Sequence, residues 1–320
     1  MTPLTTSHLV PDGSGPPLRP DITVGTRLGE VAAEVPDREA LVEGLPGGRG
    51  RRWTYGELLA DAERCASALL DHFETGERIG VWAHNLPEWV VLEYGAALAG
   101  LTLVTLNPSL QPGEAAYVLR QSRAAGVFVV PDVRGNPIAT HAAEIQADLP
   151  ELRHVLRLDQ LEELPVGSRT RTELPEVRGD DPAQIQYTSG TTGSPKGVVL
   201  RHHAVVDNAS LWADRVGVAD GASFVGPMPL FHTGGCVLAV LGALSRRATL
   251  VLPPGFEPGL LLELIERERG QFCGAVPTML IAAMEHPDFA SQDLSSWTGV
   301  VSGGAQVPEA LVRKIESALG

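Results

Sequence analysis

The sequence predicts an α/β fold in which mostly parallel strands are covered by helices. Short apolar runs alternate with longer stretches whose apolar residues recur at helical spacing, and this pattern continues along most of the chain. The run 101–106 (LTLVTL) is apolar enough to be buried on both faces, as the strands of parallel sheets are. Such alternation is typical of open sheets whose parallel strands are joined by helical crossovers.

The first part of the chain shows clear helix boundaries. Thr54 and Glu57 form a T-x-x-E capping box before an apolar-periodic stretch, which predicts a helix over 56–73. Pro87 opens the following helix and Gly100 ends it. Further strands are expected at 40–42, 78–82, 126–130 and 155–158, further helices at 22–37, 112–124 and 137–148, and a hairpin tip at 45–52.

Two segments break the alternation. Residues 159–182 are rich in Glu, Arg, Pro and Gly, and we expect them to link a first α/β subdomain over 22–158 to a second over 183–320. Residues 1–21 lack the basic start and apolar centre of a signal peptide and are expected to form a disordered or loosely attached arm. In the second subdomain, strands are expected at 223–226, 248–252, 272–275 and 299–302, and helices at 202–216, 234–245, 257–269, 277–285 and 308–319.

The composition excludes several classes of partner. A net charge of −14 argues against nucleic acid or an anionic membrane as the main partner. The cysteines at 65, 236 and 273 are far apart in apolar or helical surroundings, so buried free thiols are expected and no metal cluster is visible. The longest apolar run, near 234–244, is too short to span a bilayer. A cytoplasmic location is the corresponding expectation.

The stretch 187–197, YTSGTTGSPKG, is the most informative motif. Its glycines allow close backbone approach, its Ser and Thr residues supply hydroxyls, and Lys196 supplies a positive charge. Apolar flanks on both sides predict strand, loop, strand. Neither the P-loop nor the dinucleotide fingerprint matches. A Gly- and Ser-rich surface hairpin is the alternative. Among 25 basic residues, however, only Lys196 and Lys314 are lysines, which favours a cradle for a polyphosphate.

Two other segments follow predicted strands at the edge where ligands of α/β sheets bind. In PLFHTGG (229–235), His232 could border a ligand or could merely cap the next helix, and the spacing alone leaves both interpretations open. In SGGA (302–305), two glycines allow the backbone to approach a flat ring, and an ordinary strand-to-helix turn is the alternative.

These motifs together resemble the AMP-forming adenylating enzymes, which include acyl-CoA synthetases, amino-acid adenylation domains and luciferases. YTSGTTGSPKG resembles their signature, PLFHTGG their second core motif, and 78–100, 106–110 and 276–279 other landmarks. The resemblance covers about 25–320. It implies the large N-terminal domain of the acyl-CoA synthetases, with two mostly parallel sheets flanked by helices. That domain would be incomplete at its C-terminus, and the small C-terminal domain would be absent.

The resemblance also implies roles for individual residues. The β- and γ-phosphates of ATP would be wrapped by the loop, and Lys196 would oppose their charge as the catalytic residue. Thr188 would offer its hydroxyl to Mg²⁺, which prefers oxygen ligands. His232 and Ala305 would border the acid, and CoA would be the co-substrate. The nucleotide-binding residues would be Thr188, Ser189, Gly190, Thr191, Thr192, Gly193, Lys196, Gly303, Gly304 and Ala305.

The reaction so implied is activation of a carboxylic acid by ATP to an acyl adenylate, followed by thioester formation with CoA. Amino-acid adenylation domains tend to carry Asp where this chain has His232, so we expect a fatty or other acid without an α-amino group. The family's Tyr-Gly-x-Thr-Glu and Thr-Gly-Asp segments and its C-terminal lysine do not occur, and Lys314 is interpreted as a solvated charge. The chain alone is therefore expected to be inactive or weakly active.

Three alternatives stay open on the sequence. The chain could be a non-catalytic nucleotide- and acyl-binding fragment, it could await a C-terminal domain supplied in trans, or, as the least favoured interpretation, it could be an amino-acid adenylation domain. The sequence does not specify which acid is used, and a homodimer is left open.

Overall fold

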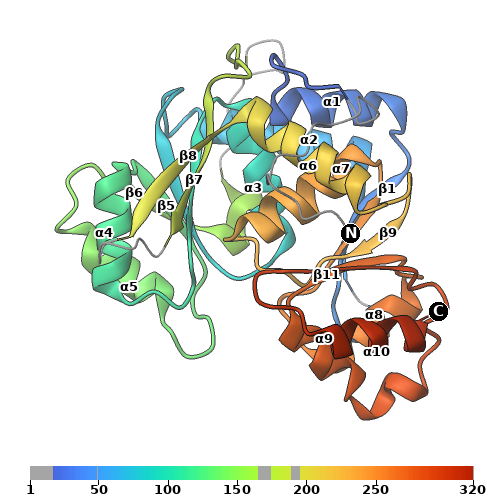
Figure 1. Cartoon of the computed structure of the whole chain (residues 1–320). Helices are drawn as coiled ribbons and strands as arrows, with labels where there is room; N and C mark the ends of the chain where they lie inside the picture. Colours follow the sequence, from blue (N-terminus) through green and yellow to red (C-terminus); the bar gives the residue numbers. More distant parts are fainter. Residues whose placement is uncertain (1–16, 49, 165–173, 189–194, 320) are drawn as a thin grey trace, which may run out of the picture.

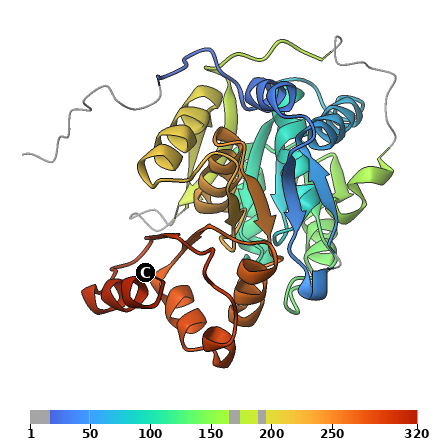
Figure 2. The same cartoon turned by 90° about the vertical axis from the view of Figure 1, so that its right-hand side faces the viewer.

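Two six-stranded, mostly parallel sheets form the framework of the protein (Figures 1 and 2). The computed structural model describes residues 17–48, 50–164, 174–188 and 195–319. Sheet I has the strand order β12-β11-β9-β10-β1-β2, and sheet II the order β6-β5-β3-β4-β7-β8. Only the pairs β1–β2 and β7–β8 are antiparallel among the described strand pairs. The predicted fold class is confirmed.

The elements follow one another closely along the chain. The strands are β1 (Glu39–Glu43), β2 (Arg52–Thr54), β3 (Arg78–Trp82), β4 (Thr102–Leu106), β5 (Gly126–Val129), β6 (His154–Arg157), β7 (Pro182–Thr188), β8 (Lys196–Arg201), β9 (Ser223–Val225), β10 (Thr249–Leu252), β11 (Phe272–Ala275) and β12 (Gly299–Ser302). The α-helices are α1 (Val24–Glu34), α2 (Tyr55–Leu69), α3 (Pro87–Leu98), α4 (Pro112–Ser122), α5 (Ile138–Gln146), α6 (His202–Arg215), α7 (Gly242–Ser245), α8 (Pro258–Arg267), α9 (Pro277–Met284) and α10 (Glu309–Leu319). The π-helix η4 (Gly234–Leu241) precedes α7, and the short 3₁₀ turns are η1 (Pro46–Gly48), η2 (Leu158–Glu163) and η5 (Pro287–Ala290).

Local sequence signals account for many of these boundaries. The capping box of α2 forms as predicted, with the Glu57 N–H donating to Thr54 Oγ1 at 3.2 Å and the Thr54 N–H donating to Glu57 Oε2 at 2.8 Å. Proline opens α3, and Gly100 beyond its end has a φ of +67°, which favours glycine. The predicted helix 234–245 divides into η4 and α7. The predicted hairpin tip 45–52 is shorter than expected, because β2 begins at Arg52.

The two sheets do not follow the predicted division into 22–158 and 183–320. Strand β1 lies beside β10, with Leu41 opposite Leu250, and β7 lies beside β4, with Leu103 opposite Gln184. The segment 159–182 therefore connects two strands of sheet II, and does not separate one sheet from the other. The division could not be predicted correctly, because a sequence pattern shows only the local period of a segment. Which sheet a strand joins depends on partners far away in the chain.

Helices fill the space between the sheets and cover their outer faces. Helix α3 lies between the sheets and is buried on all sides, which explains why it is apolar around its whole circumference. Helices α4 and α5 cover the outer face of sheet II, and α8, α9 and α10 lie beyond sheet I (Figures 1 and 2). The three cysteines are buried free thiols, as predicted. No helix in the described part of the chain is both long and apolar enough to cross a bilayer.

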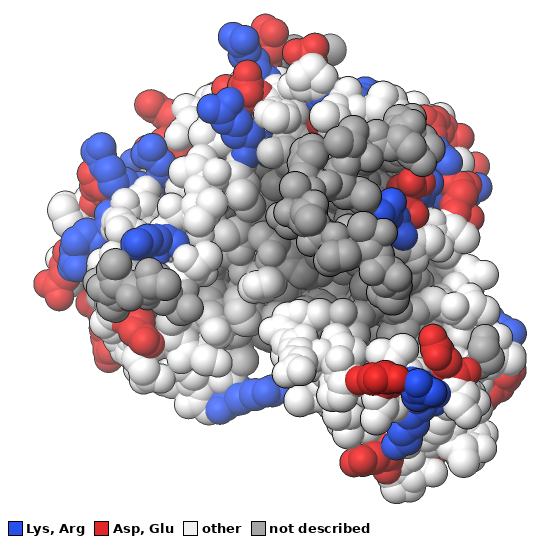
Figure 3. Space-filling view, in the orientation of Figure 1, with Lys and Arg blue, Asp and Glu red and all other residues white. Residues whose placement is uncertain are grey.

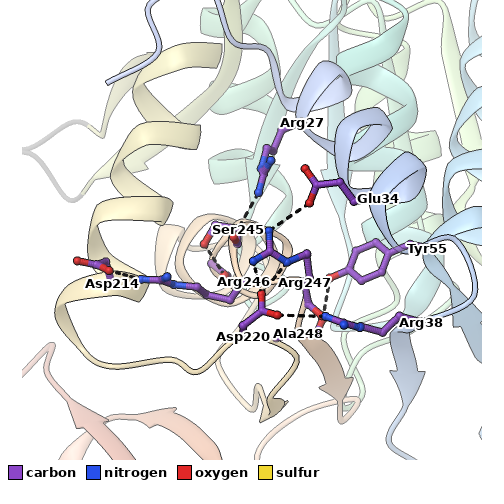
Figure 4. A network of polar contacts seen from close by, with 11 residues as sticks. Arg27, Glu34, Arg38, Tyr55, Asp214, Asp220, Ser245, Arg246, Arg247 and Ala248 are labelled. Atoms are coloured by element: carbon purple, nitrogen blue, oxygen red, sulfur yellow. Dashed lines mark hydrogen bonds and ion pairs between the residues drawn. The ribbon is translucent and has the colours of Figure 1, made fainter. Parts of the chain in front are cut away.

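The N-terminal helices are fastened to the turn that precedes β10 (Figure 4). The Arg247 guanidinium contacts Glu34 at 3.1 Å and Asp220 at 2.6 Å, and the Tyr55 hydroxyl donates to the Ala248 carbonyl at 2.7 Å. Of the predicted arm 1–21, residues 1–16 lie outside the described residues. Residues 17–21 are attached through Arg19, whose guanidinium contacts Glu30 at 2.7 Å.

Charged side chains are distributed without a patch of one sign on the face seen in Figure 3. Basic and acidic groups are interspersed toward the periphery of that face. On this face the described charged residues therefore form no single acidic patch, although the chain carries a net charge of −14.

Candidate functional site

A cavity of about 340 Å³ opens beside the carboxyl ends of β11 and β12 in sheet I. Its lining includes His232, Gly303 and Gly304, so the structure brings together the two predicted segments PLFHTGG and SGGA. This position is the one expected for a ligand of a parallel sheet, outside the carboxyl ends of the strands. Ala305 follows Gly304 directly and is exposed.

Most of the cavity wall is apolar. The described lining carries no Asp, Glu, Lys or Arg side chain, and His232 is its one ionisable group. A ligand with an ammonium group would therefore find no countercharge there, whereas an apolar chain would be desolvated favourably. The lining comes from α6, β9, η4, β11, β12 and the segments that follow β9 and β12, and it comprises Trp212, Phe224, Met228, His232, Thr233, Gly234, Leu238, Ala239, Gly274, Ala275, Val301, Ser302, Gly303 and Gly304.

Glycine is required at particular points in the cavity wall and next to it. A Cβ atom at Gly235 would lie 2.3 Å from the Pro229 carbonyl oxygen, so the PLFHTGG turn cannot close with another residue there. Gly304 has a φ of +78°, which L side chains rarely adopt. A Cβ atom at Gly303 would meet no heavy atom within 4 Å. The free space beside Gly303 is compatible with a flat ring lying against this backbone.

The imidazole of His232 has two roles at once. Its Nδ1 accepts a hydrogen bond of 3.0 Å from the Gly234 N–H at the start of η4, and its side chain lines the cavity. The hydrogen bond to Gly234 confirms the interpretation that His232 caps the next helix, and its place in the cavity lining is compatible with a role beside a ligand, which stays a prediction. Because Nδ1 is an acceptor, the neutral ring carries its proton on Nε2, and Nε2 can donate to a ligand oxygen.

Asn85 holds the loop that leads to His232. This side chain is 4% exposed and follows β3 of sheet II. Its Nδ2 donates to the Met228 carbonyl at 3.0 Å, and its Oδ1 accepts from the Leu230 N–H at 2.8 Å. This role of Asn85 was not predicted, because the segment 78–100 was interpreted only as a family landmark. A polar residue directly after a buried strand, at the edge where ligands bind, was the available signal.

The predicted phosphate loop extends from a hairpin in sheet II. Strands β7 and β8 pair in antiparallel fashion, with Thr188 opposite Lys196, which confirms the two strands predicted on either side of the loop. Lys196 is exposed. The loop residues Ser189, Gly190, Thr191, Thr192 and Gly193 lie outside the described residues. Thr188 and Lys196 do not line the 340 Å³ cavity, so no described contact joins them to His232 or Gly303.

Helix α4 anchors both ends of this hairpin. The Tyr117 hydroxyl donates to the Pro195 carbonyl at 3.0 Å and accepts from Gln121 Nε2 at 2.9 Å. The Tyr187 hydroxyl donates to the Val118 carbonyl at 3.2 Å. These two tyrosines fix where the loop leaves and re-enters the sheet. Neither contact was predicted, because Tyr117 in an amphipathic helix and Tyr187 in a strand carry no local signal of their distant partners.

The described residues offer little to a metal ion by themselves. No group of three or more His, Cys, Asp or Glu side chains among them could hold a metal. Thr188 contributes one hydroxyl oxygen, a donor type that Mg²⁺ accepts. As far as the described residues go, a magnesium ion would thus be held mainly through a ligand that brings most of the oxygen donors.

Comparisons with known proteins identify the family. The model of the AMP-binding enzyme family matches residues 28–320. The human mitochondrial medium-chain acyl-CoA ligase ACSF2 is 34% identical over 332 residues, which cover 92% of this chain and 52% of the relative. The putative acyl-CoA synthetase YngI of Bacillus subtilis (strain 168) is 30% identical and is covered to 59%. The chain thus spans little more than half the length of these curated relatives.

Solved structures agree with this assignment. A fatty acyl CoA synthetase of Mycobacterium tuberculosis is 30% identical, with a TM-score of 0.82 over 92% of this chain and 57% of that one. The inhibitor-bound N-terminal domain of FACL13 from the same organism is 31% identical, with a TM-score of 0.80, and 73% of it is covered. The fold, the hairpin that bears the signature motif and the extent of the sequence match lead to one conclusion: this chain belongs to the AMP-binding enzyme family.

Proposed function

We propose that this chain is the part of an acid–thiol ligase that binds ATP and a carboxylic acid, forms the acyl adenylate and passes the acyl group to CoA. The observation that carries the proposal is the uncharged, largely apolar cavity in which His232 meets Gly303 and Gly304. Family membership supports the use of ATP and CoA.

In the proposed complex the apolar part of the acid occupies the 340 Å³ cavity. Its carboxylate lies near His232, where an Nε2–H donor would orient one oxygen. The adenine ring lies against the backbone of Gly303, Gly304 and Ala305. The β- and γ-phosphates are held by the residues from Thr188 to Lys196, and magnesium bound to these phosphates would supply further positive charge, with the Thr188 hydroxyl as a ligand.

The chemistry needs positioning and charge neutralisation. A carboxylate oxygen attacks the α-phosphorus in line with the leaving group, a new P–O bond forms, and the bond to pyrophosphate breaks. Lys196 stabilises the negative charge that develops on the leaving pyrophosphate. No general base is needed, because the nucleophile is already an anion. In the second step the CoA thiolate attacks the acyl carbonyl carbon and AMP leaves.

The acid is proposed to be a fatty acid or another acid without an α-amino group, because the described cavity wall has no carboxylate to pair with an ammonium. The printed name of the human relative specifies medium-chain acids, and we extend that class to this chain as a proposal. A role in fatty acid metabolism in the cytoplasm is part of the same proposal, and a homodimer or a C-terminal domain supplied in trans stays open.

Equilibrium binding tests the two halves of the site separately. Lys196→Ala should weaken ATP binding at least about tenfold, because a charge-assisted contact is worth roughly 1.5–3 kcal/mol. Lys314→Ala is the matched control, since it removes the other lysine of the chain from exposed α10 and should leave the ATP affinity unchanged. An equal loss in both variants, or none in Lys196→Ala, would contradict the proposed phosphate site.

The acid half is tested with a straight-chain acid and its α-amino analogue. The acid should bind more tightly, and tighter binding of the amino analogue would favour an amino-acid adenylation domain. Pyrophosphate release should be weak or absent with these 320 residues, because the Tyr-Gly-x-Thr-Glu and Thr-Gly-Asp segments are not among them. Binding of both ligands without turnover is also the result expected of a binding fragment, so turnover after addition of a C-terminal domain in trans separates these two functions.

A further inference from the structure

A network of buried polar side chains connects sheet II with the wall of the 340 Å³ cavity. Gln184 and Gln186 project from the same face of β7 and are 2% and 7% exposed. Gln186 Nε2 donates to Gln184 Oε1 at 3.1 Å and to the Cys236 sulfur at 3.3 Å. Gln186 Oε1 accepts from the Thr105 hydroxyl at 3.1 Å. Each polar atom of the Gln186 amide therefore has a partner.

The network of buried polar side chains reaches both predicted ligand regions, the phosphate loop and the acid cavity. Gln186 lies two positions before Thr188, where the strand gives way to the predicted phosphate loop. Cys236 is fully buried in η4, and its sulfur lies 3.4 Å from the His232 carbonyl oxygen. The same helix supplies Leu238 to the cavity wall. Gln186 and Cys236 thus form a hydrogen-bonded route from the strand of the phosphate loop to the backbone of His232, and the Cys236 sulfur also lies 3.4 Å from Gln184 Oε1 on the same strand.

The network of buried polar side chains ends on the carboxyl group of Glu93, which is also buried. Gln184 Nε2 donates to Glu93 Oε1 at 2.5 Å, and Glu93 on α3 is 3% exposed. Buried amides are costly unless they are hydrogen-bonded, and apolar residues would satisfy a central strand at lower cost. A hydrogen-bonded polar network in a core specifies one geometry, because a shift of any member leaves its neighbours unpaired.

We propose that Gln186 is a positioning residue that couples the nucleotide loop to the acid cavity through Cys236. A ligand that shifts β7 at Thr188 moves the Gln186 amide, and the Cys236 sulfur and the His232 carbonyl must follow or lose their partners. ATP therefore favours one arrangement of the cavity wall, and the acid favours the same arrangement of β7. This inference rests on the proposed function, since it requires that both ligands bind.

The coupling is measurable as a change in affinity. The dissociation constant of a straight-chain acid is determined by calorimetry without ATP and with saturating ATP, and the reverse titration must give the same factor because coupling is reciprocal. The coupling factor is the ratio of the dissociation constant without ATP to that with saturating ATP. In the wild-type chain we expect a coupling factor of at least about five. Gln186→Met keeps the length of the side chain and removes its hydrogen bonds, and the factor should fall to within about twofold of unity.

Two further variants separate coupling from simple destabilisation. Cys236→Ala should lower the coupling factor as Gln186→Met does, and the double variant should add nothing more, because both residues lie on one route. Thr102→Val is the matched control. It removes a buried hydroxyl that donates to the Pro182 carbonyl at 3.3 Å, at the other end of β7, and should leave the coupling factor unchanged.

The outcomes that overturn the proposal are distinct. Coupling that survives in Gln186→Met, or falls equally in Thr102→Val, shows that Gln186 has only a structural role. Independent binding of ATP and acid to the wild-type chain also refutes the coupling, while leaving the proposed function intact. Failure of the wild-type chain to bind either ligand refutes the proposed function itself, and the coupling with it.

Discussion

Glu93 carries a carboxyl group into the interior of the protein, where its charged form is poorly solvated. Burial raises its pKa well above the ordinary value, and the hydrogen bond from Gln184 opposes this rise only in part. The group is therefore protonated in the folded protein at pH values where it is ionised in the unfolded chain. The native state binds the extra proton, so folding stability must fall as the pH rises above the unfolded pKa of about 4.3.

Replacing Glu93 with Gln removes this titration and keeps the shape of the side chain. The stability of Glu93→Gln relative to wild type should increase as the pH rises above about 5, by up to about 1.4 kcal/mol per pH unit until the folded pKa is reached. Urea denaturation at several pH values measures the difference. Glu316→Gln, at an exposed position of α10, should show no such trend. Parallel stability curves for Glu93→Gln and wild type would mean that Glu93 is ionised in the fold.

Gly303 in the cavity wall and Gly235 beside it differ in what a methyl group would meet. Gly235→Ala places Cβ 2.3 Å from the Pro229 carbonyl oxygen, so the turn must open, and we expect a loss of about 1–3 kcal/mol in stability. Gly303→Ala meets no atom within 4 Å and should change stability by less than about 0.5 kcal/mol, yet weaken nucleotide binding if adenine lies there. Thermal denaturation together with ATP titration of both variants checks the contrast. Equal stabilities would contradict the close approach of Gly235 to Pro229, and unchanged ATP affinity in Gly303→Ala would contradict the adenine position.

At the scale of elements, the β7–β8 hairpin depends on α4 for its orientation. Tyr117→Phe removes the hydrogen bond to the Pro195 carbonyl, which is worth about 1 kcal/mol, and should weaken ATP binding about fivefold. Tyr55→Phe is a matched control, because its hydroxyl donates to the Ala248 carbonyl near the amino end of β10. That variant should lower the melting temperature and keep the ATP affinity. Reversed effects would show that the tyrosine of α4 stabilises the fold and does not orient the loop.

The elements themselves were predictable because their signals are local. The capping box at Thr54 and Glu57 and the proline at position 87 mark helix starts within a few residues of where they occur. Contiguous motifs likewise identified His232, Gly303 and Gly304, which do meet in one cavity. The roles of Asn85, Tyr117 and Gln186 could not be predicted. Each acts through a partner between about 50 and 145 positions away, and no local period records such a partner.

At the scale of the whole molecule, the chain passes from sheet I to sheet II and back again. Strand β1 completes the same sheet as β9 to β12, and β7 and β8 complete the sheet begun by β3. The apolar core between the sheets is continuous, with α3 at its centre. The Arg247 contacts of Figure 4 add ion pairs between α1 and the turn before β10. Neither sheet can therefore lose its structure without exposing the other.

This interleaving predicts that the described sheets unfold together in one cooperative transition. Hydrogen exchange in increasing urea should give the same opening free energy for amides in β5 of sheet II and β10 of sheet I, because both require global unfolding. Leu41→Ala in β1, with its side chain 1% exposed, should lower both values equally, by about 2–5 kcal/mol. If the predicted halves 22–158 and 183–320 were independent, this substitution in the first half would leave the exchange of β10 unchanged. Two separate unfolding transitions would instead support the predicted division into 22–158 and 183–320, which the strand order of the sheets opposes.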